Sequence, residues 1–208
     1  MPPLSRLLDM LFPPRERALR ARSVSYETLV ALMQPVRIIS TAPAAHALLP
    51  YRHPLVQAAI TEAKFNDARR AQDALGAVLA EYLQDVVPKE ERVVLIPVPI
   101  SAKRLRERGY NQAERICRAA QRCFKALSVE TGLVQRIRDT PPQTSLGGTA
   151  RRSNLQGAFT VARAPDPHTL YIVIDDVITT GATLSAMLEA LRASGAARIL
   201  PIALAHSP

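Results

Sequence analysis

One stretch, residues 170–184, constrains the fold of this chain more than any other: LYIVIDDVITTGATL. It opens with five apolar residues rich in β-branched types, which is typical of a strand buried on both faces of a parallel sheet. Asp175 and Asp176 follow directly, then hydroxyl residues around Gly181, and then apolar residues at helical spacing. The stretch therefore predicts a strand, a tight turn and a helix, with two carboxylates at the carboxyl end of the strand.

The predicted turn has the features of an anion-binding site. Backbone N–H groups at a helix N-terminus point away from the helix, and the helix dipole favours negative charge there. Gly181 lets the backbone approach a phosphate closely, because glycine has no Cβ. We therefore expect a phosphate-binding loop made of Val177, Ile178, Thr179, Thr180, Gly181, Ala182 and Thr183.

The two carboxylates suit a sugar rather than a second phosphate. Carboxylates accept hydrogen bonds, and the vicinal hydroxyls of a sugar donate them. The order of residues therefore favours a ribose 5-phosphate, with its phosphate in the loop and its 2′- and 3′-hydroxyls on Asp175 and Asp176. The alternative is a solvated acidic turn before a threonine-capped helix, which explains an acidic pair but not the whole ordered string. A GxxxxGK[ST] nucleotide-binding loop is absent from the sequence.

The same string resembles the motif with which type I phosphoribosyltransferases bind 5-phosphoribosyl 1-diphosphate (PRPP). The resemblance implies an α/β fold, in which a parallel sheet is flanked by helices. It implies that Asp175 and Asp176 bind the ribose hydroxyls and that residues 177–183 bind the 5-phosphate. It also implies that Mg²⁺ arrives with PRPP near the two aspartates, with no direct protein ligand predicted.

Residues 101–112 form the second informative stretch, after an apolar strand predicted at 92–97. Loops at the carboxyl ends of parallel strands meet in one crevice, so this stretch should face the loop at 175–183. Its basic side chains could neutralise a diphosphate, and the expected binding residues are Ser101, Lys103, Arg104 and Arg108. The alternative is an exposed basic joint between two helices.

Residues 138–154 are rich in proline, glycine and arginine and are long for a loop inside a compact domain. Such loops often serve as lids over a bound ligand, although a disordered excursion is the alternative. The residues that could close over a bound anion are Tyr110, Asn111, Gln112, Arg151 and Asn154.

Further motifs, in the same order along the chain, sharpen the resemblance. RGYNQ at 108–112, TPPQ at 140–143, RxxN at 151–154 and GAF at 157–159 all precede the PRPP motif. Together with Lys64-Phe65, they are similar to the ComF family, phosphoribosyltransferase-fold proteins linked to DNA uptake in competent bacteria. The resemblance covers roughly residues 45–205. ComF proteins usually carry a four-cysteine zinc module near the N-terminus, but the cysteines here are Cys117 and Cys123 alone, so we expect no zinc.

Composition bounds the remaining possibilities. The absence of a long apolar run predicts no membrane span, and the start of the chain lacks the pattern of a secretory signal. With two cysteines six residues apart, a reducing cytoplasm is the expected location. We place a soft boundary near residue 50, between an N-terminal segment (1–50) and a phosphoribosyltransferase-like domain (51–208). A homodimer is compatible with the sequence.

Charge leaves two classes of function open. The formal net charge is +9, and residues 91–165 carry a basic excess that accounts for it. The first hypothesis is a phosphoribosyltransferase with an unidentified acceptor and unidentified catalytic residues, linked to DNA uptake. The second is a non-catalytic module that binds PRPP or a nucleotide in the crevice and single-stranded DNA on the basic 91–165 face. A PRPP-sensing regulator is a third, simpler reading.

Overall fold

The computed structural model describes residues 24–138, 155 and 157–207. The N-terminal segment up to residue 23 and the lid candidates Arg151 and Asn154 lie outside the described residues. In the part that is described, a six-stranded sheet has the order β1-β2-β8-β7-β3-β4, and β5 and β6 form a separate two-stranded antiparallel sheet. All pairings in the large sheet are parallel except that of β1 with β2.

The strands and helices follow one another along the chain as a predominantly α/β pattern. The strands are β1 (Val36–Ile38), β2 (Ala45–Pro50), β3 (Val93–Pro97), β4 (Leu127–Val129), β5 (Val134–Arg136), β6 (Phe159–Val161), β7 (Leu170–Ile178) and β8 (Arg198–His206). The helices are α3 (Tyr26–Ala31), α4 (Pro54–Phe65), α5 (Arg69–Val86), α6 (Ala102–Arg108), α7 (Gln112–Cys123) and α9 (Ala182–Ala193). The predicted α/β class with a parallel sheet flanked by helices is confirmed.

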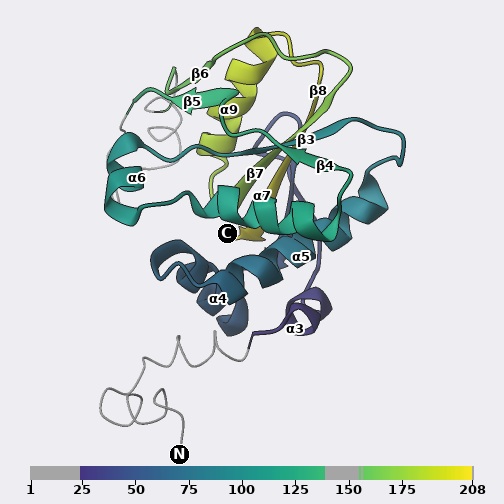
Figure 1. The fold of residues 1–208 in the computed structure, drawn as a ribbon, viewed down its shortest axis with the longest axis vertical. Helices are drawn as coiled ribbons and strands as arrows, with labels where there is room; N and C mark the ends of the chain where they lie inside the picture. The colour runs from purple at the N-terminus through teal and green to yellow at the C-terminus, as the bar shows by residue number, and fades with distance from the viewer. Residues whose placement is uncertain (1–23, 139–154, 156, 208) are drawn as a thin grey trace, which may run out of the picture.

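The helices cover both faces of the sheet. Figure 1 shows α4, α5 and α7 on one side of the strands and α9 with the two-stranded β5–β6 sheet on the other. Ile172 and Ile174 of β7 belong to the core on the α4–α5–α7 side, whereas Tyr171 and Val173 belong to the core on the α9 side. Since successive side chains of a strand point to opposite faces, this alternation is what a central parallel strand requires.

Two local expectations are corrected. Residues 42–54 mix proline with apolar residues, a pattern that predicts a linker or an irregular strand, but residues 45–50 form the regular strand β2, which pairs in parallel with β8. The edge of the main sheet therefore begins before the soft boundary near residue 50. The strand of the PRPP-like motif was expected to end before the two aspartates, but β7 continues through Ile178, because β8 pairs with it to that residue.

In the described residues, none of the helices is both long and apolar enough to cross a membrane.

Candidate functional site

The two aspartates lie where one neighbour of β7 has ended. β3 stops at Pro97, which is opposite Ile174, whereas β8 accompanies β7 to Ile178. The Val98 N–H, one residue beyond the end of β3, still donates to the Ile174 carbonyl at 2.8 Å, and the described pairing of β3 with β7 ends there. Beyond Ile174, the β3 side of β7 is therefore open for side chains or a ligand.

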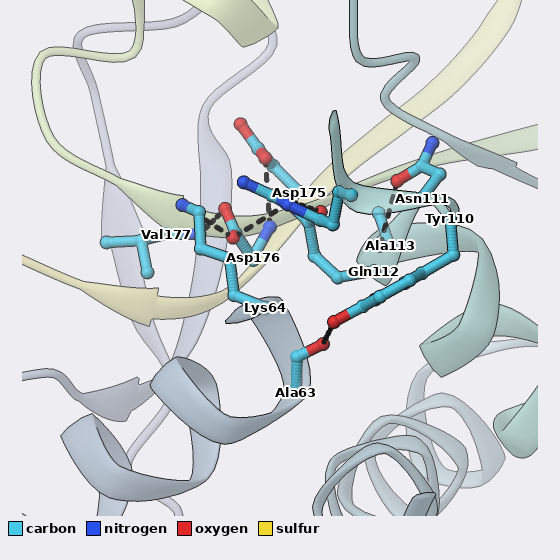
Figure 2. A network of polar contacts seen from close by, with 10 residues as sticks. Ala63, Lys64, Tyr110, Asn111, Gln112, Ala113, Asp175, Asp176 and Val177 are labelled. Atoms are coloured by element: carbon cyan, nitrogen blue, oxygen red, sulfur yellow. Dashed lines mark hydrogen bonds and ion pairs between the residues drawn. The ribbon is translucent and has the colours of Figure 1, made fainter. Parts of the chain in front are cut away.

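Asp176 is buried and held by three donors (Figure 2). Its Oδ2 lies 3.0 Å from the Lys64 Nζ and accepts a hydrogen bond of 3.0 Å from the Gln112 Nε2. Its Oδ1 accepts the Val177 backbone N–H at 2.8 Å. The carboxylate is only 8% exposed, so a cation and directed donors are needed to keep it ionised.

The environments of the two carboxyl groups push their pKa values apart. Burial raises the pKa of Asp175 to about 8, and the negative charge of Asp176 adds to that rise. Burial acts in the same direction on Asp176, but the Lys64 ammonium and the donated hydrogen bonds outweigh it and lower the pKa of Asp176. The pair therefore carries one firmly held negative charge at neutral pH, and the second charge is easily gained when a cation arrives.

The turn between α6 and α7 holds the donors of Asp176 in place. The Tyr110 hydroxyl donates to the Ala63 carbonyl at 3.1 Å and accepts the Asp67 N–H at 2.9 Å. The Asn111 amide donates to the Val98 carbonyl at 3.0 Å, and its oxygen accepts the Ala113 N–H as the N-cap of α7. Figure 2 shows the Tyr110 ring running from this turn to the end of α4. These contacts tie α4, β3 and α7 together.

This geometry bears on the lid residues expected in the turn. Tyr110 and Gln112 are buried, and Asn111 caps a helix. The hydrogen bonds of these three side chains hold neighbouring elements together, so a lid made of them would have to break those bonds in order to open. Gln112 meets the acidic pair directly, through Asp176.

A tight turn separates β7 from α9, and Val177 and Ile178, which were expected in the phosphate-binding loop, are instead the last two residues of β7. Gly181 has φ 76° and is the N-cap of α9, so the helix begins at Ala182. The Thr180 hydroxyl accepts the Ala182 N–H at 3.5 Å. A Cβ on Gly181 would come within 2.8 Å of the Thr41 methyl and 2.9 Å of the Ser40 hydroxyl. The residue must therefore be glycine for its conformation and for the close approach of residues 40 and 41.

Residues 40 and 41 are part of the site that the sequence did not reveal. Thr41 is buried, its hydroxyl donates to the Pro43 carbonyl at 2.8 Å and accepts the Ala45 N–H at the same distance. This pins the chain between β1 and β2 against Gly181. No local pattern marked the segment, because its neighbour is 140 residues away along the chain.

Of the four residues expected to bind a diphosphate, one is connected to the acidic pair by hydrogen bonds, and the others lie along α6. Arg108 donates from its guanidinium to the Gln112 side-chain oxygen, which connects it to Asp176. Ser101 is buried and caps α6, its hydroxyl accepting the Arg104 N–H at 3.3 Å. Lys103 is exposed and lies 3.9 Å from Glu107. Arg108 is therefore the one of the four that the described structure brings into contact with the acidic pair's network.

Lys64 is the functional candidate that the sequence analysis named only within a motif and gave no role. It follows Ala63, the last buried residue of the apolar face of α4, and its side chain is 30% exposed. A cation directly after an apolar helical face was the available signal, but its partner on β7 could not be identified without the fold.

The donor set does not form a closed metal site. Among the described residues, no three His, Cys, Asp or Glu side chains gather around a common point. Mg²⁺ is commonly held by one or two carboxylates together with substrate phosphates. Asp175 and Asp176 alone are too few to enclose the ion, so Mg²⁺ at this site would have to be held largely by a phosphate-bearing ligand.

Comparison with known proteins agrees with the motifs. The chain is 36% identical over 107 residues to competence protein F of Haemophilus influenzae, a match that covers 50% of this chain and 46% of the relative. It is 26% identical over 122 residues to competence protein ComFC of Streptococcus pneumoniae, covering 59% and 52%. This chain is a relative of the ComF proteins.

Other comparisons add context to this ComF relationship. DNA utilization protein YhgH of Salmonella typhi is 29% identical over 132 residues, covering 64% of this chain and 56% of YhgH. The chain thus spans about half the length of the curated relatives it matches. No protein-family model matches the chain. A hypoxanthine phosphoribosyltransferase from Staphylococcus aureus superposes with a TM-score of 0.39 at 16% identity, covering 69% of this chain and 65% of that one.

Proposed function

We propose that this ComF relative binds PRPP with Mg²⁺ in the crevice at the carboxyl ends of β3 and β7. One observation carries the proposal: β7 delivers an acidic pair and, five residues later, a glycine that opens the N-terminus of α9. Carboxylates and free helical N–H groups are thereby held at the two ends of one short segment. A ribose phosphate has hydroxyl donors and an anion at matching ends.

The phosphate end is supported by the loop and by the length of α9. The helix has 12 residues, so its N-terminal N–H groups carry the partial positive charge of a full helix dipole. Gly181 and Ala182 are buried, whereas Thr179 is exposed and Thr180 and Thr183 are half-buried, so hydroxyls line the accessible side. These hydroxyls and N–H groups would bind the 5-phosphate.

The ribose end is supported by a count of free acceptors. Asp176 already accepts two hydrogen bonds at Oδ2 and one at Oδ1, which leaves one lone pair at Oδ1. Asp175 accepts the Asp176 N–H at its Oδ1, at 2.9 Å, which leaves a lone pair on that oxygen. Each carboxylate can therefore accept one hydroxyl of a vicinal pair.

The diphosphate would lie toward the α6–α7 turn. Arg108 already points into the network through Gln112, and Lys64 is the second cation beside the acidic pair. Mg²⁺, held with the diphosphate near Asp175 and Asp176, would supply positive charge that neutralises the leaving group. The approach of these positive charges favours the ionised form of Asp175.

The reaction that such a site supports is phosphoribosyl transfer. A nitrogen nucleophile would form a bond to C1 of the ribose as the bond from C1 to the diphosphate oxygen breaks, with the electron pair leaving on the diphosphate. The contribution of the chain's own residues would be positioning and electrostatic stabilisation. We assign no general base among the described residues. The proposal is therefore PRPP binding, and phosphoribosyl transfer is the reaction that this binding would permit.

The names of the relatives suggest where such a protein would act. Competence protein F, ComFC and YhgH are named for competence or for the use of DNA. We place this chain in the same setting, as a PRPP-binding protein connected to DNA uptake or utilization and working in the cytoplasm.

The test is a calorimetric titration of PRPP with Mg²⁺ into the wild-type chain and the Asp175→Asn/Asp176→Asn variant. We expect saturable binding by the wild type and its loss in the variant. The matched control is Asp73→Asn/Asp166→Asn, which removes two carboxylates that are 58% and 40% exposed. No binding by the wild type, or equal loss in both variants, would overturn the proposal.

A second candidate function, binding of single-stranded DNA, is favoured by a specific part of the basic surface. The arginines of α7 are paired: Arg115 with Asp67, Arg118 with Glu114 and Arg122 with Asp73. On α6, by contrast, Arg104 and Arg106 form no ion pair with any residue that the structure describes. Of the two helices in the basic 91–165 segment, α6 is therefore the better candidate to contact the phosphates of a DNA strand.

A further inference from the structure

Phe65 is a large aromatic side chain in an unusual place. It is the last residue of α4 and is 63% exposed, whereas the apolar residues of α4 that face the core, from Val56 to Ala63, are buried. A lone exposed aromatic needs no explanation by itself. Its neighbours are what give it meaning.

Two cations lie beside the Phe65 ring. The guanidinium carbon of Arg108 is 5.2 Å from the ring centroid, and the Nζ of Lys64 is 6.0 Å from it. Both distances are within the range of cation–π attraction. The ring comes from α4 and Arg108 from the end of α6, so two separate elements converge on it.

Both cations also belong to the network of the acidic pair. Lys64 lies 3.0 Å from Asp176, and Arg108 donates to Gln112, which donates to the same carboxylate. The Lys64 ammonium is therefore 3.0 Å from the Asp176 carboxylate and 6.0 Å from the centroid of the Phe65 ring. Lys64 and Arg108 thereby connect the exposed ring to the carboxylate beside which the ribose is expected.

We propose that Phe65 is a stacking platform for a nucleobase whose ribose and phosphate occupy the crevice. This inference rests on the proposed ribose-phosphate site and names the class of group that meets it. Base–aromatic stacking tolerates any base, because every base has a π-face, and it is typically combined with cations that follow the phosphates. Here Phe65 supplies the aromatic face, and Lys64 and Arg108 supply the cations.

The base could belong to a free nucleotide, as an acceptor or product of transfer, or to a single-stranded DNA. The common chemistry is a planar heterocycle joined to a pentose phosphate. A ligand without the base would occupy the ribose and phosphate positions and gain nothing from Phe65. That difference makes the platform separable from the site beneath it.

The first test compares ribose 5-phosphate with adenosine and uridine 5′-monophosphate by calorimetry in the wild type and in Phe65→Leu. We expect Phe65→Leu to weaken both nucleotides by about five-fold or more, since stacking on an aromatic contributes roughly 1–3 kcal/mol per base. Affinity for ribose 5-phosphate should not change. Phe65→Tyr should retain nucleotide affinity, because it keeps the ring.

Val86→Ala is the matched control. Val86 is another exposed apolar side chain, 41% exposed, and it is the last residue of α5, whereas α4 precedes the first residue of that helix. Equal nucleotide affinity in wild type and Phe65→Leu, with ribose 5-phosphate still bound, would overturn the platform and leave the proposed function intact. Unchanged nucleotide affinity is what we expect if the Phe65 ring only positions the Arg108 guanidinium. Absence of ribose 5-phosphate and PRPP binding in the wild type would instead overturn the proposed function.

The second test distinguishes the sources of the base. Oligo(dT) and an abasic oligonucleotide of equal length are titrated into the wild type and Phe65→Leu. A DNA source predicts that the variant loses affinity for oligo(dT) but not for the abasic strand. A mononucleotide source predicts the loss for nucleotides alone. Loss for neither ligand contradicts the platform.

Discussion

At the scale of single residues, the site depends on how one buried negative charge is kept. Asp176 is ionised because Lys64, Gln112 and a backbone N–H face its carboxylate. The carboxyl group of the preceding residue, Asp175, has a raised pKa and therefore favours its neutral form. Asymmetry of this kind prepares a pair of carboxyl groups for a ligand that brings positive charge and hydroxyl donors.

Removal of the cation should destabilise the chain in a pH-dependent way. Because the pKa of Asp176 is lowered in the folded state, its contribution to stability is present above the pKa of an unfolded aspartate, about 3.9, and is lost as pH falls through the folded value. Lys64→Gln should therefore cost about 1–3 kcal/mol at pH 7 and less near pH 3.5, as measured by urea unfolding. Lys103→Gln, which removes an exposed lysine, should cost about 0–1 kcal/mol at both pH values. A cost for Lys64→Gln that does not change with pH would contradict this account.

Asp175 should show the opposite pH dependence. Its folded pKa is raised to about 8, so the folded chain retains a proton that the unfolded chain releases above about pH 4, and stability falls as pH rises toward 8. Asp175→Asn removes this loss of stability. The melting temperature of the variant, relative to that of the wild type, should therefore rise between pH 5 and pH 9.

Asp166→Asn is the control for sign. The backbone N–H of His168 and the Thr169 hydroxyl lower the pKa of Asp166, so its replacement should destabilise the chain above about pH 4 and never stabilise it. If Asp175→Asn loses stability relative to the wild type as pH rises, Asp175 is not the neutral partner of the pair.

At the scale of elements, the segment β7–loop–α9 was largely predictable, and the surfaces around it were not. The apolar run, the acidic pair and the glycine are local patterns, so they predict a strand, a tight turn and a helix without knowledge of the fold. The end of β7 was misplaced, because only pairing with β8 shows that the strand continues past Asp176. Lys64 and Thr41 reach the site through tertiary contacts, for which no spacing rule exists.

Gly181 offers a prediction at this scale, because the chain contains a matched glycine. Gly181 has φ 76° and ψ 2°, and Gly109 has φ 81° and ψ −10°, but a Cβ meets atoms only at Gly181. Alanine at either position should cost about 1 kcal/mol for the backbone conformation. Gly181→Ala should cost a further 1–3 kcal/mol for the collision with Thr41 and Ser40, as measured by urea unfolding. Equal costs would mean that residues 40 and 41 do not press on the loop.

At the scale of the whole molecule, net charge overstates the surface available to a polyanion. The formal charge is +9, yet the arginines of α7 face acidic partners on their own helix or near α5. The sequence predicted a broad basic face, because composition counts charges and does not pair them. Within residues 91–165, α6 is the described helix on which two arginines, Arg104 and Arg106, form no ion pair with a described residue.

Charge reversal can separate these two helices. Arg104→Glu/Arg106→Glu and Arg115→Glu/Arg118→Glu lower the net charge equally, so a nonspecific field would weaken binding of oligo(dT) equally in both. If α6 contacts the strand, the first variant should weaken binding more and reduce the steepness of its salt dependence, as measured by fluorescence anisotropy between 50 and 200 mM salt. A larger effect of the α7 variant would contradict a role for α6.

The central claim is the position of the ribose phosphate, and amide resonances report it directly. In a titration of ribose 5-phosphate followed by ¹H–¹⁵N correlation spectra, the amides of Thr179 to Thr183, together with those of Asp176 and Val177, should shift most. The amides at the far end of α5 should not move. Largest shifts in α6, or no shift in residues 176–183 at saturation, would contradict the account.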